Sequence, residues 1–478
     1  MLTERRTDTA LKVCTAALIA VSLLLTFTVS DYYIFNRIGE FNFFFVFAQW
    51  VKKAGLLLLA LAVFYKKRSC SDVAKYVLPA FVIISACSFG GFFDVTMLTE
   101  NASPAQKVFA SLNEFITKPA NMALFFISCI LYLAVCALLF VRDGYKAEAA
   151  SLKFLPLALL AVMPLNIFEN FFNIDNFSPD HFLLFKNFTL WHFLAVCALA
   201  GFTIGAYYFL RKLPGQKQKD YLAAAAIVLL IQYHSKDSVV MGDGYNVYYT
   251  AFACIPLFIC NIGVYVASLA VIARKRVLYA ISFFVHAAGA LTVFFYFGKD
   301  EMSDYGIFVS YSILYFCLTH CLLFALCVLP SALGHYKFAV KDCVIPLVYY
   351  CAVIIAAAIA SGIVTSFLTS YSYDGYTLTV GEGAGFDMAP PNYAFTQVNP
   401  LPIPVIDVPV TIWKCKLNLF YLFCLYIVYV GLFWAFTGGY YAFLKIRARV
   451  LAGKTPVPEP ALSPAEAEAA ITDDEKDV

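Results

Sequence analysis

Cys260, His286 and His320 could do chemistry, because each lies well inside an apolar segment of the chain. We expect Cys260 and His320 to lie about thirteen and fourteen residues from the outer ends of their helices, about 20 Å deep. His286 lies about nine residues, or about 14 Å, from the inner end of its own helix. A thiol and an imidazole in one layer are the minimum for nucleophilic catalysis, in which the imidazole takes the proton and the thiolate attacks a carbonyl carbon. A packing role stays open, since such thiols commonly pack as small apolar groups and buried histidines bond to carbonyls or tyrosines.

Two nearby patterns bear on this site. Pro256 lies four residues before Cys260 and removes one backbone hydrogen bond, which predicts a bend in a helix over residues 247–273. Cys317, His320 and Cys321 share one helix face by their spacing, so a soft-metal site is conceivable. We expect no metal and no other cofactor, because the pattern lacks two CxxC pairs and a carboxylate partner.

Three further polar residues are candidates for binding a substrate. Lys52 and Lys53 are adjacent charges near the middle of an apolar segment, where charge is costly. Either the first part of a helix over residues 43–65 lies at the membrane interface, or both lysines face a cavity and hold a phosphate. The aromatic-rich stretch 41–50 favours the interface. His192 lies near the outer mouth of its helix and could reach water.

The elements that must position these residues are membrane helices. The chain has 478 residues, of which 62% are hydrophobic and 14% are charged, and its mean hydropathy is +0.77. A water-soluble core cannot bury that much apolar surface. We predict an all-α polytopic membrane protein of about twelve transmembrane helices. Their ranges are 10–29, 43–65, 75–94, 121–141, 152–168, 188–210, 220–239, 247–273, 277–297, 306–330, 342–369 and 416–444.

The loops between these segments alternate in charge. One set carries 24 of the 34 Lys and Arg residues, whereas the opposite set carries 8 of them and 17 of the 31 Asp and Glu residues. The positive-inside rule therefore predicts that both termini are cytoplasmic. An acidic outer surface would not attract an anionic soluble substrate, and the asymmetric charge does not indicate nucleic acid. The expected location is the bacterial plasma membrane.

The chain divides into two predicted membrane domains. Residues 1–175 form a domain of about five helices, and residues 185–450 form a core of about seven. Residues 371–413 are a long outer loop rich in Gly and Pro, and loops of that length are often lids or binding elements. Residues 454–478 are rich in Pro, Ala, Glu and Asp, which predicts a disordered cytoplasmic tail.

A set of motifs in fixed order links the second half of the chain to a known family. The motifs are His192 in a core helix, Pro256-Leu-Phe-Ile-Cys260-Asn-Ile-Gly, Arg274-Lys-Arg, Thr319-His320, Asn392-Tyr393, and Pro400 and Asp407 before the last helix. Over residues 188–442 the chain resembles the YwaF family of integral membrane proteins, which is related to the vertebrate ether-lipid acyltransferase known as transmembrane protein one-six-four. In that group a membrane-embedded Cys or Thr and a His are implicated in acyl transfer or hydrolysis of lipid esters. The resemblance implies that Cys260 is the nucleophile and His320 its partner. Phe258 stands where bacterial members have a His.

These observations favour a membrane-embedded lipid acyltransferase or lipid-ester hydrolase with catalytic Cys260 and His320. His192, His286, Asn392 and Tyr393 are then candidates for substrate binding, and membrane lipids are the expected partners; the sequence names no protein partner.

Two other classes stay open. A secondary transporter or lipid flippase would suit twelve spans, with Lys52 and Lys53 on the headgroup, although no clear internal repeat and no Asp or Glu well inside a span supports it. A non-catalytic scaffold is indicated only by the acidic tail.

Overall fold

The structure is a computed structural model, and it describes most of the helical part of the chain. The described residues are 2–28, 43–87, 118–144, 148–165, 185–242, 255–295, 311–370, 372–373, 376–377, 393–395, 410–412, 415–417 and 419–452. Asn392 and the predicted tail lie outside them. The chain divides into one unit, Met1–Tyr426, and a second unit, Ile427–Val478, which holds most of the last helix.

The described residues are mostly helical, as the composition predicts. The helices are α1 (Leu2–Thr28), α3 (Phe43–Phe64), α4 (Arg68–Cys87), α6 (Lys118–Asp143), η3 (Ala149–Phe154), α7 (Leu155–Ala161), α9 (Leu190–Leu210), α10 (Gly215–Gly242), α12 (Ile259–Ala273), α13 (Arg276–Ile281), η4 (Ser282–His286), α14 (Ala287–Phe295), α15 (Tyr311–Ala332), η5 (Val340–Cys343), α16 (Val344–Ser370), η6 (Tyr393–Phe395) and α17 (Leu419–Ala452). Two short antiparallel hairpins join β1 (Ser372–Tyr373) to β2 (Tyr376–Thr377) and β3 (Val410–Ile412) to β4 (Cys415–Leu417).

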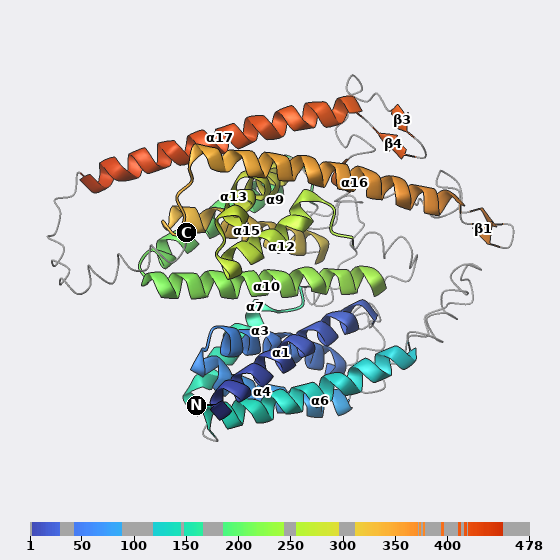
Figure 1. Ribbon diagram of the computed structural model, residues 1–478, viewed down its shortest axis with the longest axis vertical. Helices are drawn as coiled ribbons and strands as arrows, with labels where there is room; N and C mark the ends of the chain where they lie inside the picture. The colour runs from blue at the N-terminus through green and yellow to red at the C-terminus, as the bar shows by residue number, and fades with distance from the viewer. Residues whose placement is uncertain are drawn as a thin grey trace. The chain divides into compact units, whose positions relative to one another are not determined.

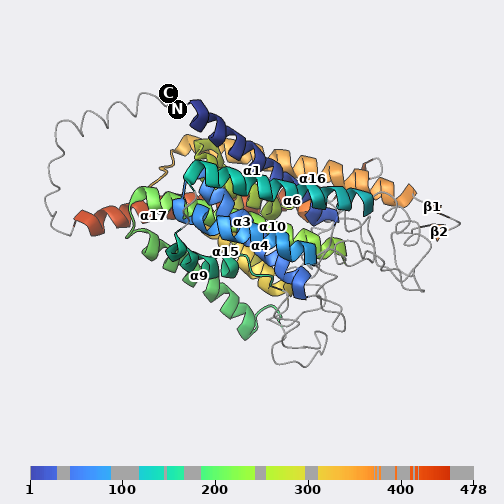
Figure 2. The ribbon, with the colours of Figure 1, turned by 90° about the horizontal axis from the view of Figure 1, so that it is seen from below.

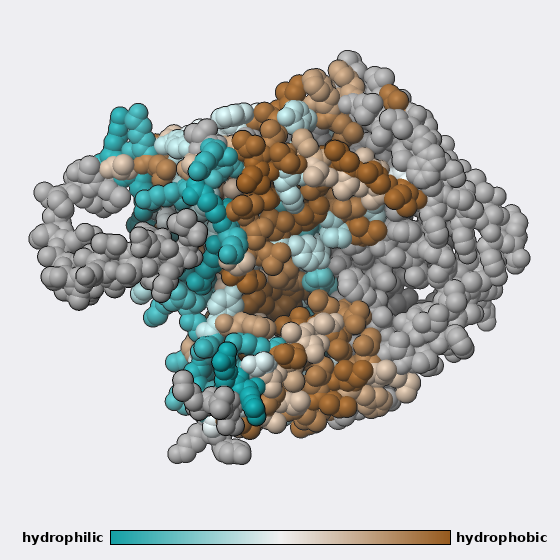
Figure 3. Space-filling model, viewed as in Figure 1, coloured by the Kyte–Doolittle hydropathy of each residue, from teal (hydrophilic) through white to brown (hydrophobic). Residues whose placement is uncertain are grey.

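Seven helical segments of the described residues are long and apolar enough to cross a membrane. They are Arg5–Leu24, Met122–Asp143, Leu190–Leu210, Arg276–Phe294, Ile313–Ala332, Lys341–Ile363 and Phe420–Val450. Each of the twelve predicted ranges overlaps a described helix. Because only seven described segments are long and apolar enough to cross a membrane, the total of twelve spans stays a prediction. On the face of the molecule that Figure 3 shows, hydrophobic residues cover much of the described surface, and hydrophilic residues gather along one side.

Helix α10 lies between two groups of helices in the first unit. It contacts α1 and α3 on one side and α12 and α15 on the other (Figure 1). The helices α1, α3, α4 and α6 pack on one another around buried Leu18, Leu59, Leu78 and Tyr132, and both views show α1 beside α6 (Figures 1 and 2).

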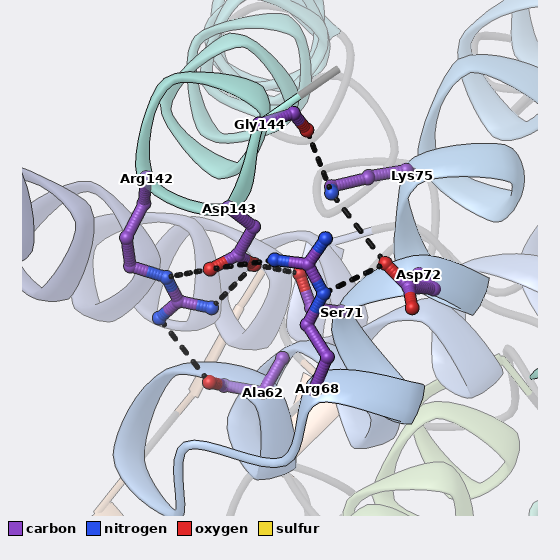
Figure 4. Close-up of polar contacts among 8 residues, drawn as sticks. All are labelled: Ala62, Arg68, Ser71, Asp72, Lys75, Arg142, Asp143 and Gly144. Atoms are coloured by element: carbon purple, nitrogen blue, oxygen red, sulfur yellow. Dashed lines mark hydrogen bonds and ion pairs between the residues drawn. The ribbon is translucent and has the colours of Figure 1, made fainter. Parts of the chain in front are cut away.

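An ion-pair network joins the ends of α4 and α6 (Figure 4). Arg68 lies between the carboxylates of Asp72, at 3.3 Å, and Asp143, at 3.5 Å. Lys75 pairs with Asp72 at 3.5 Å and donates to the carbonyl of Gly144 at 3.3 Å. The Asp72 and Lys75 side chains are each 1% exposed, so the network fixes two helix ends at a buried position.

The chain around Pro256 differs from the prediction of one bent helix. Residues 255–258 are not helical, and α12 begins only at Ile259, after Phe258 in an extended conformation (φ −78°, ψ 144°). The first helical bond runs from the Ile262 N–H to the Phe258 carbonyl at 3.0 Å. The proline ring disfavours helical backbone before it and removes a donor, which agrees with a helix that begins only beyond the proline. Cys260 therefore lies in the first turn of a helix.

Candidate functional site at the start of helix α12

Cys260 is the second residue of α12 and is half-buried. Its thiol lies 3.6 Å from the side-chain oxygen of Asn261. The first backbone N–H groups of a helix have no acceptor within it, and the helix dipole makes this end positive. A negative charge on or beside the Cys260 sulfur is therefore stabilised by the local backbone.

The three predicted residues lie at similar heights in their helices. Thirteen residues separate Cys260 from Ala273, ten separate His286 from Arg276, and twelve separate His320 from Ala332. These separations correspond to about 20, 15 and 18 Å along each helix axis.

The ends from which these heights are counted lie on the same side of the molecule. A turn of two residues joins α12 to α13, and Arg276 forms an ion pair with Asp342, beyond the end of α15, at 2.6 Å. The ring of Tyr279 stacks on that of Tyr336 at 5.6 Å. A hydrocarbon core about 30 Å thick would hold Cys260, His286 and His320 well inside it.

His286 contacts the first turn of α12 directly. Its Nδ1–H donates to the carbonyl oxygen of Ile259 at 2.9 Å, and its Nε2 accepts from the Tyr349 hydroxyl at 3.1 Å. The carbonyl only accepts, so Nδ1 carries a proton, and in the neutral ring Nε2 is then the acceptor. The residue is 0% exposed and both ring nitrogens are bonded within the protein, so no nitrogen of His286 faces a substrate in this conformation.

Gly263 makes the close approach of His286 possible. A Cβ added at Gly263 would lie 2.8 Å from His286 Nδ1 and 3.0 Å from its Cγ. The imidazole therefore packs closely against the backbone of α12 at Gly263, one turn after Ile259. His286 also ends η4, a π-helical turn inside a longer helix, and such turns re-aim side chains at functional sites.

Tyr393 contacts the residue that immediately precedes α12. Its side chain is 0% exposed, and its ring meets that of Phe258 edge to face at 6.1 Å. Phe258 is two residues before Cys260, so the structure brings one predicted substrate-binding residue next to the chain that leads into α12. The neighbouring candidate, Asn392, lies outside the described residues.

His320 and His192 meet at a different point, the residue Phe294. His320 donates from Nδ1 to the Phe316 carbonyl at 2.8 Å, and its ring lies edge to face with Phe294 at 6.3 Å. His192 accepts from the Phe188 N–H at 2.9 Å and donates from Nε2 to the Phe294 carbonyl at 2.6 Å. Because Nδ1 of His320 carries the proton, Nε2 is its basic nitrogen.

The two groups of residues belong to one set of packed helices. Helix α12 packs against both η4 and α15, which carry His286 and His320. The pairing of Cys260 with His320 stays a prediction. Sequence reasoning gave no role to Tyr349, Gly263 or Phe294; the glycine stood in the quoted Pro256 motif, but nothing in the sequence signalled a tyrosine 63 residues after His286.

A family model matches residues 177–429, just over half of the chain, and its description is the TMEM164 family. This chain belongs to the TMEM164 family. The predicted relation to transmembrane protein one-six-four is thereby confirmed, while the name YwaF stays a resemblance. No curated protein and no solved structure matches the chain. The TMEM164 family region contains Cys260, His286, His320, His192 and Tyr393, so α12 and all its described polar partners belong to the shared part.

The apolar helices and the TMEM164 family match indicate an integral membrane protein. Helices α1 to α7 precede the matched region. Lys52 and Lys53 lie there, on α3, and are 5% and 9% exposed. The sequence favoured an interfacial position for this pair over a cavity that holds a phosphate. The structure buries both residues within the protein, and the phosphate-binding cavity stays a prediction.

The described residues also bear on the predicted metal-site pattern. Within them, no group of three His, Cys, Asp or Glu side chains is placed to hold a metal ion. Cys317, His320 and Cys321 share one face of α15 by their spacing, but among the described residues they do not form a group that could hold a metal ion.

Proposed function

We propose that the protein is a membrane-embedded lipid acyltransferase or lipid-ester hydrolase with Cys260 as its nucleophile. The observation that carries this proposal is the position of Cys260: a half-buried thiol in the first turn of α12, about 20 Å from the helix end that carries Arg274. At that depth a thiol meets acyl chains and the ester bonds drawn toward them.

The proposed reaction has two halves. His320 Nε2 takes the thiol proton, and the Cys260 sulfur forms a bond to the carbonyl carbon of a lipid ester. The oxygen of the tetrahedral intermediate carries the negative charge, and the N–H groups of the first turn, at the positive end of the helix dipole, are suited to stabilise it. The C–O bond then breaks, the lysolipid alkoxide takes the proton from the imidazolium, and the acyl group remains on sulfur as a thioester.

In the second half, a hydroxyl compound removes the acyl group. A second lysolipid or water loses its proton to His320 and attacks the thioester carbon, and the Cys260 sulfur leaves and is reprotonated. A lysolipid acceptor makes the protein an acyltransferase, and water makes it a hydrolase. Asn392 and Tyr393 are proposed to lie at the mouth through which a headgroup enters, with His192 fixing that end of α9.

The test compares cysteine variants of the full-length protein in phospholipid vesicles. Cys260→Ala is expected to abolish transfer or release of acyl chains, measured by mass spectrometry of the lipids. Cys129→Ala is the matched control, because Cys129 is also a half-buried thiol in an apolar helix. Unchanged lipid turnover in a folded Cys260→Ala protein would remove the proposal.

A second candidate function is a lipid flippase or secondary transporter. The observation that favours it is the burial of two adjacent ammonium groups, Lys52 and Lys53, in α3. An anionic phosphate headgroup is the kind of ligand that two adjacent ammonium groups would attract. Vesicle uptake or lipid scrambling that is lost in Lys52→Ala but kept in Cys260→Ala would select this function over the enzyme.

The proposal also includes the location and orientation. The protein is proposed to lie in a bacterial plasma membrane, with membrane lipids as its partners and both termini in the cytoplasm. Labelling of single cysteines introduced at Lys275 and Lys337, two exposed basic positions near one end of the helices, tests the orientation. Labelling from the cytoplasmic side alone is expected.

A further inference from the structure

A single peptide group connects His286 to the thiol of Cys260. The carbonyl of this peptide belongs to Ile259, and its N–H belongs to Cys260. The carbonyl accepts the His286 Nδ1–H bond at 2.9 Å, while the N–H lies in the first turn of α12, where the helix supplies no acceptor. A hydrogen bond to the carbonyl of a peptide polarises that peptide and makes its N–H a better donor.

The position of His286 is set by three separate elements. The Tyr349 hydroxyl, on α16, donates to Nε2 at 3.1 Å, and the two rings meet at an angle of 75°. The π-helical turn of η4 presents the ring to α12, and Gly263 leaves the space that the ring occupies. With 0% of the residue exposed, the imidazole can neither turn away nor be replaced by solvent without moving one of these elements.

We propose that His286, supported by Tyr349, is a positioning residue that fixes the first turn of α12 and so sets the orientation and reactivity of the Cys260 thiol. It does this without contacting the substrate, because both of its ring nitrogens are bonded within the protein. The role of His286 in catalysis rests on the proposed function. Its effect on the reactivity of the Cys260 thiol does not, because that effect is measured without lipid turnover.

The obvious rival is that His286 only stabilises the core. Three variants separate the roles, because two of them keep the hydrogen bond to Ile259 and one removes it. In His286→Asn, the side-chain amide nitrogen replaces Nδ1 and can still donate to the Ile259 carbonyl. In His286→Leu, an apolar side chain fills the space and donates to nothing. Tyr349→Phe removes the hydroxyl and leaves the Ile259 bond in place.

The readout is the rate at which a membrane-permeant maleimide alkylates Cys260, followed by peptide mass spectrometry on the full-length protein in phosphatidylcholine vesicles. His286→Leu is expected to lower this rate about five- to tenfold, the effect of losing one buried hydrogen bond. Cys129, on α6, reports non-specific changes and is expected to react at the wild-type rate in every variant. His286→Asn is expected to stay within about twofold of wild type, and Tyr349→Phe to fall by about two- to threefold.

An unchanged Cys260 rate in a folded His286→Leu protein would overturn the inference, and so would an equal loss in His286→Asn and His286→Leu. If His286→Leu does not fold, Tyr349→Phe decides: a reduced rate at Cys260 alone supports the inference, and an unchanged rate overturns it. Lipid turnover in Cys260→Ala is measured in parallel. Turnover that survives there removes the proposed function, whereas the alkylation rates still decide the role of His286.

Discussion

Replacing Gly263 with alanine tests the contact on which the arrangement around Cys260 depends. The new Cβ would lie 2.8 Å from His286 Nδ1, whereas ordinary contacts of this kind begin at 3.4 Å. The imidazole or the backbone of α12 must therefore move by about 0.6 Å or more. Both flank the bond between His286 and Ile259, so a shift of this size would stretch the 2.9 Å bond toward 3.5 Å, where it is largely lost.

Three terms set the expected magnitude. Overpacking costs about 1–3 kcal/mol, and the lost hydrogen bond costs about 1 kcal/mol. Alanine regains about 1 kcal/mol of helix propensity over glycine. The net result is a destabilisation of about 1–3 kcal/mol, together with slower alkylation of Cys260.

Gly205→Ala is the matched control for this variant. Gly205 is also a glycine inside an apolar helix, α9, but a Cβ added there meets nothing within 4 Å. This substitution is expected to leave stability unchanged or to raise it slightly, because only the propensity term remains.

The assay is thermal unfolding of both variants in detergent micelles, followed by tryptophan fluorescence, with maleimide alkylation of Cys260 measured on the same samples. Gly263→Ala is expected to unfold at a lower temperature than Gly205→Ala. Equal midpoints and a wild-type alkylation rate in Gly263→Ala would show that the close packing of His286 on α12 is wrong.

Two further predictions concern charged groups away from this site. Lys75→Met leaves the buried Asp72 carboxylate with Arg68 as its remaining ion-pair partner and is expected to destabilise the protein by about 1–3 kcal/mol. Lys12→Met breaks a more exposed pair and is expected to cost about 0–1 kcal/mol. Similar unfolding midpoints for the two variants would contradict the buried network. Burial, with added effects from Lys219 and Arg274, holds the pKa of His335 below its usual 6.5. The unfolded chain then binds more protons than the folded one, so stability should fall as pH drops from about 7 to 5. His335→Gln should reduce this acid sensitivity in thermal unfolding, and an unchanged pH profile would show that the histidine does not contribute.

The sequence predicted the helices well, because a bilayer demands about twenty apolar residues for each span and hydropathy reads that demand directly. It also placed Cys260, His286 and His320 at similar depth, which follows from helical rise alone. The predicted start of the helix that carries Cys260 was wrong, because the proline motif was interpreted as a bend within one helix. The rule that the residue before proline avoids helical backbone would have favoured a break at Pro256.

The contacts within the site could not be predicted in the same way. His286 reaches Ile259 across 27 residues and Tyr349 across 63, and His192 reaches Phe294 across 102. These pairs depend on how helices pack on one another, which the periodicity of a single helix does not encode.

The burial of Lys52 and Lys53 also depends on how helices pack on one another. Aromatic residues before the pair indicated an interface. The packing of α3 against α1, α4, α7 and α10 places the ammonium groups inside the protein.

The central claim is that the Cys260 sulfur carries an acyl group during turnover. The most direct measurement incubates the full-length protein with a phospholipid bearing an isotope-labelled acyl chain, and then determines the mass of the peptide that contains Cys260 after an acid quench. The account predicts a labelled acyl adduct on Cys260 that hydroxylamine removes, as expected for a thioester. An unmodified Cys260 peptide while labelled lipid products accumulate would contradict it.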